Sequence, residues 1–276
     1  MSDLANHRSG IAEVNGAHLY YEVAGEGHPL VLLHAGIADS RMWDDQFTEF
    51  ARRYRVLRFD FRGFGKSGIP PQAYSMRGDL YELLRQLDIQ RAHLIGVSMG
   101  GGIAIDVALE RPELVSALIP VGPGVSGMSE ATPEEIAYFE QVEAAIAAGD
   151  IERANEMETH VWVDGLHRTR EQGPANVRER IYAMNAISFA NLAASEQAKT
   201  LPLDPPAVGR LGTITAPTLA IVGDADMSGI QHAVDLIVAS VPNARKVVMH
   251  DTAHVPNMEQ PKEFNAHVLV FLDTLG

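Results

Sequence analysis

The chain contains no cysteine. This absence excludes disulfide bonds, thiol catalysis and thiolate metal sites, and it fits a reducing compartment. No apolar run approaches the roughly 18 residues that a membrane-spanning helix needs. Residues 1–10 are polar and lack the apolar centre of a signal peptide. We therefore expect a cytoplasmic protein.

Positive charge is also scarce. The sequence has 22 Lys and Arg against 36 Asp and Glu, and its formal net charge is −14 at pH 7. A charge of this sign repels nucleic acid and anionic membranes, so we expect neither as a partner. The 276 residues are 46% hydrophobic and 21% charged. They suffice for one large α/β domain, or for a domain with an insertion, and they leave open whether the chain forms a homo-oligomer.

Strands and helices alternate at both ends of the chain. Strands are predicted at residues 11–14, 17–23, 30–33, 54–61, 93–95, 114–121, 217–222 and 244–249, and helices at 44–53, 76–87, 101–110, 231–240 and 261–275. The Asn15-Gly16 pair predicts a tight hairpin turn between the first two strands. The alternation predicts a mostly parallel central sheet that is flanked by helices on both faces.

The alternation is interrupted over residues 125–208, where the pattern is almost wholly helical. Thr132-Pro133 is typical of a helix start, and apolar residues then recur at helical spacing. We expect a helical insertion packed over the sheet, with residues 1–124 and 209–276 forming the core domain.

A Gly-x-Ser-x-Gly motif, Gly96 to Gly100, follows the apolar strand at residues 93–95. A strand that turns this sharply into a helix leaves no room for side chains two residues before and after Ser98. Strained turns of this kind tend to lie at functional sites, although the same motif also occurs in turns that only connect two elements.

A serine hydroxyl needs a base to take its proton, and the base needs an acid to orient it. Asp226 and His254 each come just after a predicted strand, in the chain order Ser, Asp, His. In an open parallel sheet such groups meet at the carboxyl ends of the strands. We therefore expect Ser98 to be the nucleophile, His254 the base and Asp226 its acidic partner.

Two other aspartates compete for the acidic role. Asp224 lies two residues before Asp226, and Asp251 lies three residues before His254. Spacing from Gly223 favours Asp226.

Two further histidines have alternative interpretations. His250 and His254 are four residues apart, which on a helix would suit a metal, but they fall in a strand-to-loop segment. We expect no metal and no other cofactor. His34 follows the strand at residues 30–33, and we expect it to be a hydrogen-bonded structural residue.

Over essentially its whole length the sequence resembles the α/β-hydrolases. The matching motifs are Leu33-His34-Ala35-Gly36 with Trp43, Asp60-x-Arg62-Gly63-x-Gly65-x-Ser67, Gly96-x-Ser98-x-Gly100-Gly101, Pro217-Thr218-Leu219 with Gly223-x-x-Asp226, and His254 with Glu259-x-Pro261-x-x-Phe264. The resemblance implies the same three catalytic residues and a cap at residues 125–208. One departure is Ala35, where many relatives have glycine.

The oxyanion of the reaction needs preorganised donors. The backbone N–H of Met99, at the start of the helix, is one candidate. The resemblance implies Gly36 as the second donor, with Ile37 as the neighbouring alternative.

Serine at the turn disfavours the dehalogenases and epoxide hydrolases of this fold, which use aspartate there. Within the serine branch the sequence resembles oxoadipate enol-lactone hydrolases, small carboxylesterases and cofactor-free perhydrolases. Candidate pocket residues in the cap are Trp162, Phe139, Met184 and Phe189, each of which would also fit plain packing.

The sequence thus predicts a serine hydrolase that cleaves a small carboxylic ester or lactone through an acyl-enzyme. The alternatives are a carbon–carbon bond hydrolase or perhydrolase of the same fold, and a small-molecule receptor with slow turnover.

Overall fold

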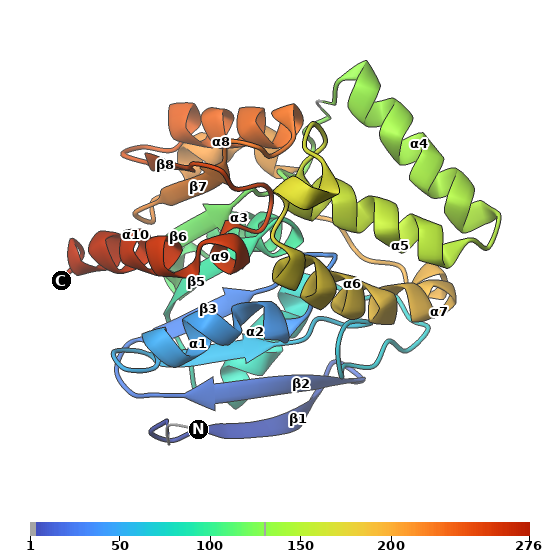
Figure 1. The fold of residues 1–276 in the computed structure, drawn as a ribbon. Coiled ribbons are helices and arrows are strands. Elements are labelled where there is room, and N and C mark those ends of the chain that lie inside the picture. Colours follow the sequence, from blue (N-terminus) through green and yellow to red (C-terminus); the bar gives the residue numbers. More distant parts are fainter. Residues whose placement is uncertain (1–3, 130) are drawn as a thin grey trace.

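Eight strands form one sheet in the computed structural model, which describes residues 4–129 and 131–276 (Figure 1). The strands are β1 (Arg8–Val14), β2 (Ala17–Ala24), β3 (Pro29–Leu33), β4 (Arg55–Phe59), β5 (Ala92–Val97), β6 (Val115–Val121), β7 (Leu219–Gly223) and β8 (Arg245–Met249). Their order in the sheet is β1-β2-β4-β3-β5-β6-β7-β8. β2 pairs antiparallel with β1 and β4, and every other pairing is parallel. The predicted mostly parallel sheet is confirmed.

The hairpin between β1 and β2 turns at Asn15-Gly16. Both residues have positive φ, 47° for Asn15 and 79° for Gly16, and Val14 pairs with Ala17 on either side. Such angles suit asparagine and glycine, so the predicted turn is confirmed.

Helices cover both faces of the sheet. They are α1 (Asp44–Phe50), α2 (Met76–Gln86), α3 (Met99–Glu110), α8 (Ser228–Ser240), α9 (Pro256–Glu259) and α10 (Pro261–Asp273). Buried side chains of α2, α3 and α8 pack on one face, and those of α1 and α10 pack on the other. The chain therefore has a three-layered α/β core, as predicted.

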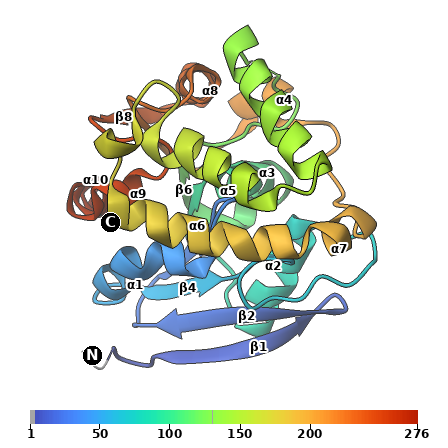
Figure 2. The same ribbon diagram turned by 45° about the vertical axis from the view of Figure 1, so that its right-hand side comes forward.

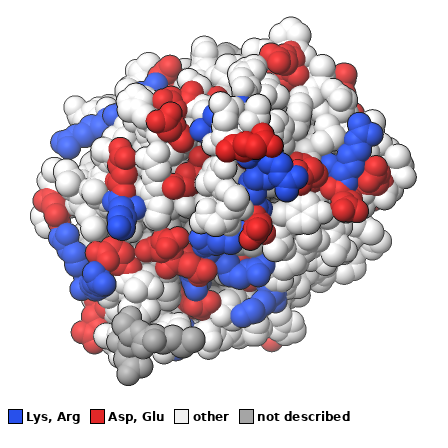
Figure 3. Space-filling view, in the orientation of Figure 1, with Lys and Arg blue, Asp and Glu red and all other residues white. Residues whose placement is uncertain are grey.

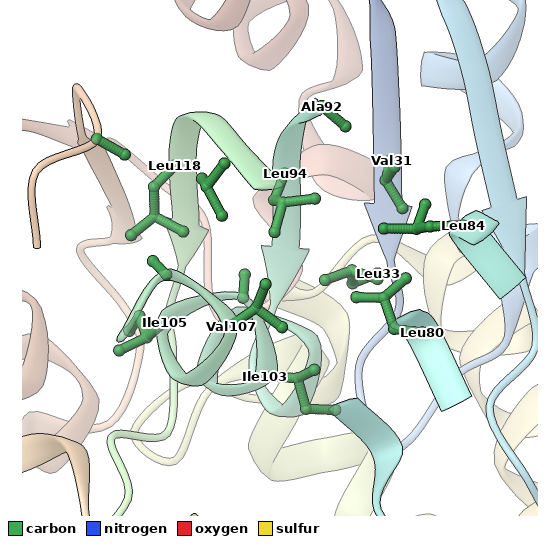
Figure 4. Packing of buried hydrophobic residues seen from close by; sticks show 14 of the residues in the cluster. Val31, Leu33, Leu80, Leu84, Ala92, Leu94, Ile103, Ile105, Val107 and Leu118 are labelled. Carbon is green, nitrogen blue, oxygen red and sulfur yellow. The ribbon is translucent and has the colours of Figure 1, made fainter. Parts of the chain in front are cut away.

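The packing of α3 fixes the position of the turn that precedes it. Figure 4 shows Ile105 and Val107 of α3 beneath Leu118 of β6 and Leu94 of β5. All four side chains are almost fully buried. Because α3 is held against β5 and β6, the residue between β5 and α3 has a defined place at the end of the sheet.

The segment 125–208 is helical, as predicted. Its helices are α4 (Pro133–Ala147), α5 (Ile151–Thr159), α6 (Ala175–Ala190) and α7 (Leu192–Gln197), with a π-helical turn at His160–Asp164 (Figures 1 and 2). Val142 and Ala145 of α4 form a small cluster with Ala154 of α5. Val177 and Ile181 of α6 instead join the core on the sheet. The segment is therefore anchored to the sheet through α6.

Charged side chains of both signs are interspersed on the face seen in Figure 3. Charged side chains of opposite sign also form ion pairs in the structure, such as Arg170 with Glu156 at 3.3 Å and Arg180 with Asp45 at 3.3 Å. The view shows no continuous basic surface of the kind that binds nucleic acid. Over the described residues, no helix has both the length and the hydropathy needed to cross a membrane.

Candidate active site

Ser98 lies at the tight turn between β5 and α3 and has backbone angles that side-chain-bearing residues rarely adopt, φ 54° and ψ −115°. A Cβ atom at Gly96 would lie 2.3 Å from the carbonyl oxygen of Gly100, and one at Gly100 would lie 2.3 Å from that of Leu33. Both positions therefore require glycine, as the motif predicts. The close backbone packing at these two glycines holds Ser98 in its strained conformation at the carboxyl end of β5.

His254 forms a hydrogen bond with Asp226, between Nδ1 and Oδ2, at 2.8 Å. Both side chains are buried. The other carboxylate oxygen, Oδ1, accepts a hydrogen bond from the N–H of Met227 at 2.8 Å. His254 Nε2 is also buried, and no described residue offers it a hydrogen bond. This nitrogen is the one left to accept a proton.

The rival aspartates lie elsewhere. Asp224 pairs with the exposed His250, with 2.9 Å between Oδ2 and Nδ1. Asp251 is exposed, and its carbonyl oxygen accepts a hydrogen bond from Arg168. The structure thus brings Asp226 to His254 and engages the other two in different contacts. His250 faces solvent, and no group of three or more metal-binding side chains occurs in the part of the chain that the structure describes.

Ser98 and His254 line one cavity of about 290 Å³. The remaining lining residues come from the loop after β3 and from the helical segment 125–208; they are Gly36, Ile37, Ile146, Glu158, Trp162, Asn185, Ser188, Phe189 and Leu192. Two of the expected pocket residues, Trp162 and Phe189, are therefore in place.

The other two expected pocket residues do not line this cavity. Met184 lies on the face of α6 that carries Val177 and Ile181 into the core on the sheet. Phe139 packs against the cluster between α4 and α5, with its ring centroid 5.7 Å from that of Trp162. Both side chains therefore contribute to packing, Met184 to the core on the sheet and Phe139 to the cluster between α4 and α5.

Trp162 connects the helical segment to His254. The centroids of the two rings are 4.2 Å apart and their planes are inclined by 37°. The carbonyl oxygen of Trp162 also accepts a hydrogen bond from the backbone N–H of His254 at 3.2 Å. The π-helical turn that carries Trp162 is held by Asp164, which is buried and forms an ion pair with Arg178 and a hydrogen bond with His160.

Glu259 also supports the loop that carries His254. Its buried carboxylate accepts hydrogen bonds from the N–H groups of Ala253 at 2.9 Å and Val255 at 3.3 Å. Burial raises the pKa of Glu259 to about 7, although these hydrogen bonds and the charge of Arg168 oppose the shift. The two residues next to His254 in the chain are thus held by one side chain.

The loop after β3 lies beside the start of α3. Both Gly36 and Ile37 line the cavity, and a Cβ atom at Gly36 would be 3.8 Å from Cβ of Met99. Met99 is the first residue of α3, where backbone N–H groups have no partner within the helix. Residues of both elements therefore border the cavity beside Ser98.

His34 is fully buried, and both of its ring nitrogens are engaged. Nδ1 is 2.8 Å from the carbonyl oxygen of Ala35, and Nε2 accepts a hydrogen bond from the N–H of Phe61 at 2.9 Å. Burial lowers the pKa of His34, with the charges of Asp60 and Asp39 opposing the shift. These contacts give His34 a structural role, as expected.

Several cavity residues had no signal in the sequence. Glu158 is one of several glutamates in α5, and nothing in their spacing distinguishes it from Glu152 or Glu156. Asn185 and Ser188 lie within the helical pattern of α6 and carry no motif. Only the packing of α5 against α6 shows which of these polar side chains face Ser98.

Comparison with known proteins places this geometry in context. Residues 28–261 match the family described as the alpha/beta hydrolase fold. The chain is 28% identical to a protein of Rhizobium rhizogenes that carries the name carbamate hydrolase RutD, over 92% of this chain and 97% of the relative. It is 30% identical to the 2-hydroxy-6-oxo-6-phenylhexa-2,4-dienoate hydrolase of Comamonas testosteroni, over 92% and 91% of the two chains.

A solved structure is also similar. Est816, described as an N-acyl homoserine lactone degrading enzyme, superposes with a TM-score of 0.76 and 26% sequence identity, covering 95% of this chain and all of that one (100%). The names of these three proteins refer to three different substrates, a carbamate, a dienoate and a lactone. Similarity alone therefore does not choose the substrate.

Proposed function

The chain belongs to the alpha/beta hydrolase family, and from this premise we propose that it is a serine hydrolase that cleaves a small carboxylic ester or lactone through an acyl-enzyme. One observation carries the proposal. His254 is hydrogen-bonded to Asp226 through Nδ1, and its Nε2 has no hydrogen-bond partner among the described residues. The side chain of His254 lines the same cavity as Ser98.

In the proposed mechanism, Ser98 Oγ attacks the carbonyl carbon of the substrate while His254 Nε2 accepts the hydroxyl proton. His254 then delivers this proton to the leaving oxygen, which departs as the alcohol. Asp226 keeps the imidazole oriented through Nδ1 and stabilises its cation. Water, activated by the same nitrogen, hydrolyses the acyl-enzyme and releases the acid.

The tetrahedral intermediate carries a negative oxygen, which we assign to the backbone N–H groups of Met99 and Gly36. Both lie beside Ser98, and Ile37 next to Gly36 is the alternative second donor. A donor of this kind contributes about 3 kcal/mol to the transition state in comparable sites. Backbone donors of this kind need little reorganisation during the reaction, because one belongs to the first turn of α3 and the other to the short loop that follows β3.

We further propose that segment 125–208 acts as a cap that selects the substrate. It supplies seven of the eleven residues that line the cavity, among them Trp162 and Phe189. The volume of about 290 Å³ is just below the usual range for ligand pockets, which is about 300–1,000 Å³. A small substrate fits this size.

Carbon–carbon bond hydrolysis is the second candidate. It is favoured by the 30% identity to a hydrolase that is named for a 6-oxo-dienoate substrate, in which the carbonyl group is a ketone. The same three residues would have to protonate a carbon rather than an oxygen leaving group.

Activity assays with a panel of short nitrophenyl esters and a dienoate-type ketone distinguish these candidate functions. Our proposal predicts rapid ester hydrolysis that disappears in Ser98→Ala and in His254→Ala. Faster turnover of the ketone than of every ester would favour the carbon–carbon hydrolase. Ligand-dependent shifts of Tm without any turnover would identify a receptor instead. Full esterase activity in His254→Ala would contradict the assigned base.

A further inference from the structure

The cavity beside Ser98 contains an acidic side chain that the proposed reaction does not use. Glu158, near the end of α5, lines the same cavity as Ser98 and His254. Lys and Arg are absent from the residues that line this cavity in the described part of the chain. Besides His254, Glu158 is thus the ionisable side chain that a substrate would meet there.

The carboxylate of Glu158 is only partly satisfied by the protein. Oε2 accepts a hydrogen bond from Nδ2 of Asn185 at 2.7 Å. No ion pair and no second hydrogen bond to Glu158 is found among residues 4–129 and 131–276. The other oxygen is therefore available to a group that enters the cavity.

Asn185 is itself held in place. It is buried, and its Nδ2 also donates to Oδ1 of Asn155 at 3.0 Å. Asn155 in turn donates to the carbonyl oxygen of Tyr182 at 3.0 Å. This network joins α5 to α6, which lie side by side in Figure 2. Glu158 is therefore held by a rigid pair of helices rather than by a mobile loop.

The burial of Glu158 affects which groups its carboxylate attracts. Burial raises the pKa of Glu158, and the hydrogen bond from Asn185 opposes this shift. A carboxylate with one neutral partner gains from a cation or a further donor, and it repels a second carboxylate. Arg178, the buried arginine of α6, does not supply that charge, because it pairs with Glu156 and Asp164 and does not line this cavity.

We propose that Glu158 is a specificity-determining residue of this cavity, and that it selects an acyl group whose far end carries a positive charge or a hydrogen-bond donor. The inference rests on the proposed function, because it assumes that the acyl group of the substrate occupies the space between Ser98 and α5. It also implies that dicarboxylate substrates are rejected, since the cavity offers them no cation.

Binding of stable amides tests this proposal without relying on turnover. The probes are 4-aminobutanamide, pentanamide and glutaramate, whose far ends carry an ammonium group, a methyl group and a carboxylate. Affinities are measured by ligand-detected NMR in the Ser98→Ala protein. We expect 4-aminobutanamide to bind about tenfold more tightly than the other two, the effect of one charge-assisted hydrogen bond.

Two further variants in the Ser98→Ala background assign the effect to one residue. Glu158→Gln should abolish the preference for the ammonium probe. Glu152→Gln removes the same charge from an exposed position on the same helix, outside the catalytic cavity, and should leave the preference unchanged.

Equal affinities, tighter binding of glutaramate, or a preference that survives in Glu158→Gln would overturn the proposal. The comparison of the three probes within the Ser98→Ala protein is decisive even if Glu158→Gln does not fold. Failure of the proposed function would appear separately, as the absence of Ser98-dependent ester hydrolysis in the unmodified protein.

Discussion

The indole ring of Trp162 lies against the imidazole ring of His254, with the two ring centroids 4.2 Å apart. The backbone carbonyl oxygen of Trp162 also accepts a hydrogen bond from the backbone N–H of His254. Trp162 belongs to the helical segment, whereas His254 lies in the loop that follows β8 of the sheet. The proposed base is therefore positioned by the proposed cap as well as by Asp226. This contact makes Trp162 a positioning residue and not only a pocket wall.

Replacement of Trp162 by alanine should lower kcat about fivefold to tenfold. The loss corresponds to one aromatic contact, which contributes about 1 kcal/mol beyond the area that it buries. Trp162→Phe should restore most of kcat, because a ring remains against His254. Phe189→Leu, in the same cavity, should change KM more than kcat. Steady-state kinetics with a nitrophenyl ester measure this, and equal kcat values for Trp162→Ala and the unmodified protein would refute it.

The two aspartates after β7 provide a matched pair of variants. Asp226→Asn should reduce kcat by about ten-thousand-fold, because the amide no longer stabilises the imidazolium and can favour the wrong tautomer. Asp224→Asn makes the same chemical change two residues away, next to the exposed His250, and should leave kcat within about twofold. Comparable losses in both variants would show that the acid has been misassigned.

The glycines around Ser98 should be intolerant of any side chain. Gly100→Ala would place a Cβ atom 2.3 Å from the carbonyl oxygen of Leu33, so the backbone of α3 or β3 must shift. We expect a loss of about 3 kcal/mol in the free energy of unfolding, together with loss of activity. Gly68→Ala is the control, because no atom lies within 4 Å of the added Cβ. Urea denaturation curves compare the two variants, and a stable, active Gly100→Ala protein would contradict the geometry.

Glu259 should make stability depend on pH. Its pKa is raised from the ordinary 4.5 to about 7 by burial, so the folded state holds this proton more tightly than the unfolded state does. The protonated carboxyl of Glu259 therefore stabilises the folded state fully below about pH 4.5, and this stabilisation is lost as the pH rises towards 7. Its full size is about 3 kcal/mol, from a shift of roughly two and a half pH units.

Glu259→Gln removes this titration. The unmodified protein should lose stability relative to Glu259→Gln between about pH 4.5 and 7. The exposed Glu196→Gln on α7 should follow the unmodified protein at every pH. Denaturation at a series of pH values provides the measurement. Parallel curves for Glu259→Gln and the unmodified protein would show that Glu259 has no raised pKa.

Much of the fold could be predicted because its signals are local. Asn15-Gly16 indicates its hairpin through backbone preferences, and the Gly96–Gly100 motif indicates its turn because a Cβ atom has no space there. The spacing of Asp226 from Gly223 singled out the aspartate that the structure brings to His254. In each case the requirement lies within a few residues of the chain.

The content of the cavity could not be predicted in the same way, because it depends on how helices are rotated against the sheet. Met184 and Phe189 occur in the same helix and are both apolar, yet Met184 faces the sheet and Phe189 faces Ser98. Glu158 is chemically identical to its neighbour Glu156, which pairs with Arg178 instead. A single sequence shows the apolar periodicity of these helices, but it does not show how each helix is rotated about its axis relative to the sheet.

The account depends above all on the covalent step at Ser98. Mass spectrometry of the protein after reaction with a small alkyl phosphonofluoridate measures this step directly. We expect one adduct per chain, located on the peptide that contains Ser98, and none in Ser98→Ala. An adduct on a different residue, or undiminished ester hydrolysis by the Ser98→Ala protein, would contradict the account.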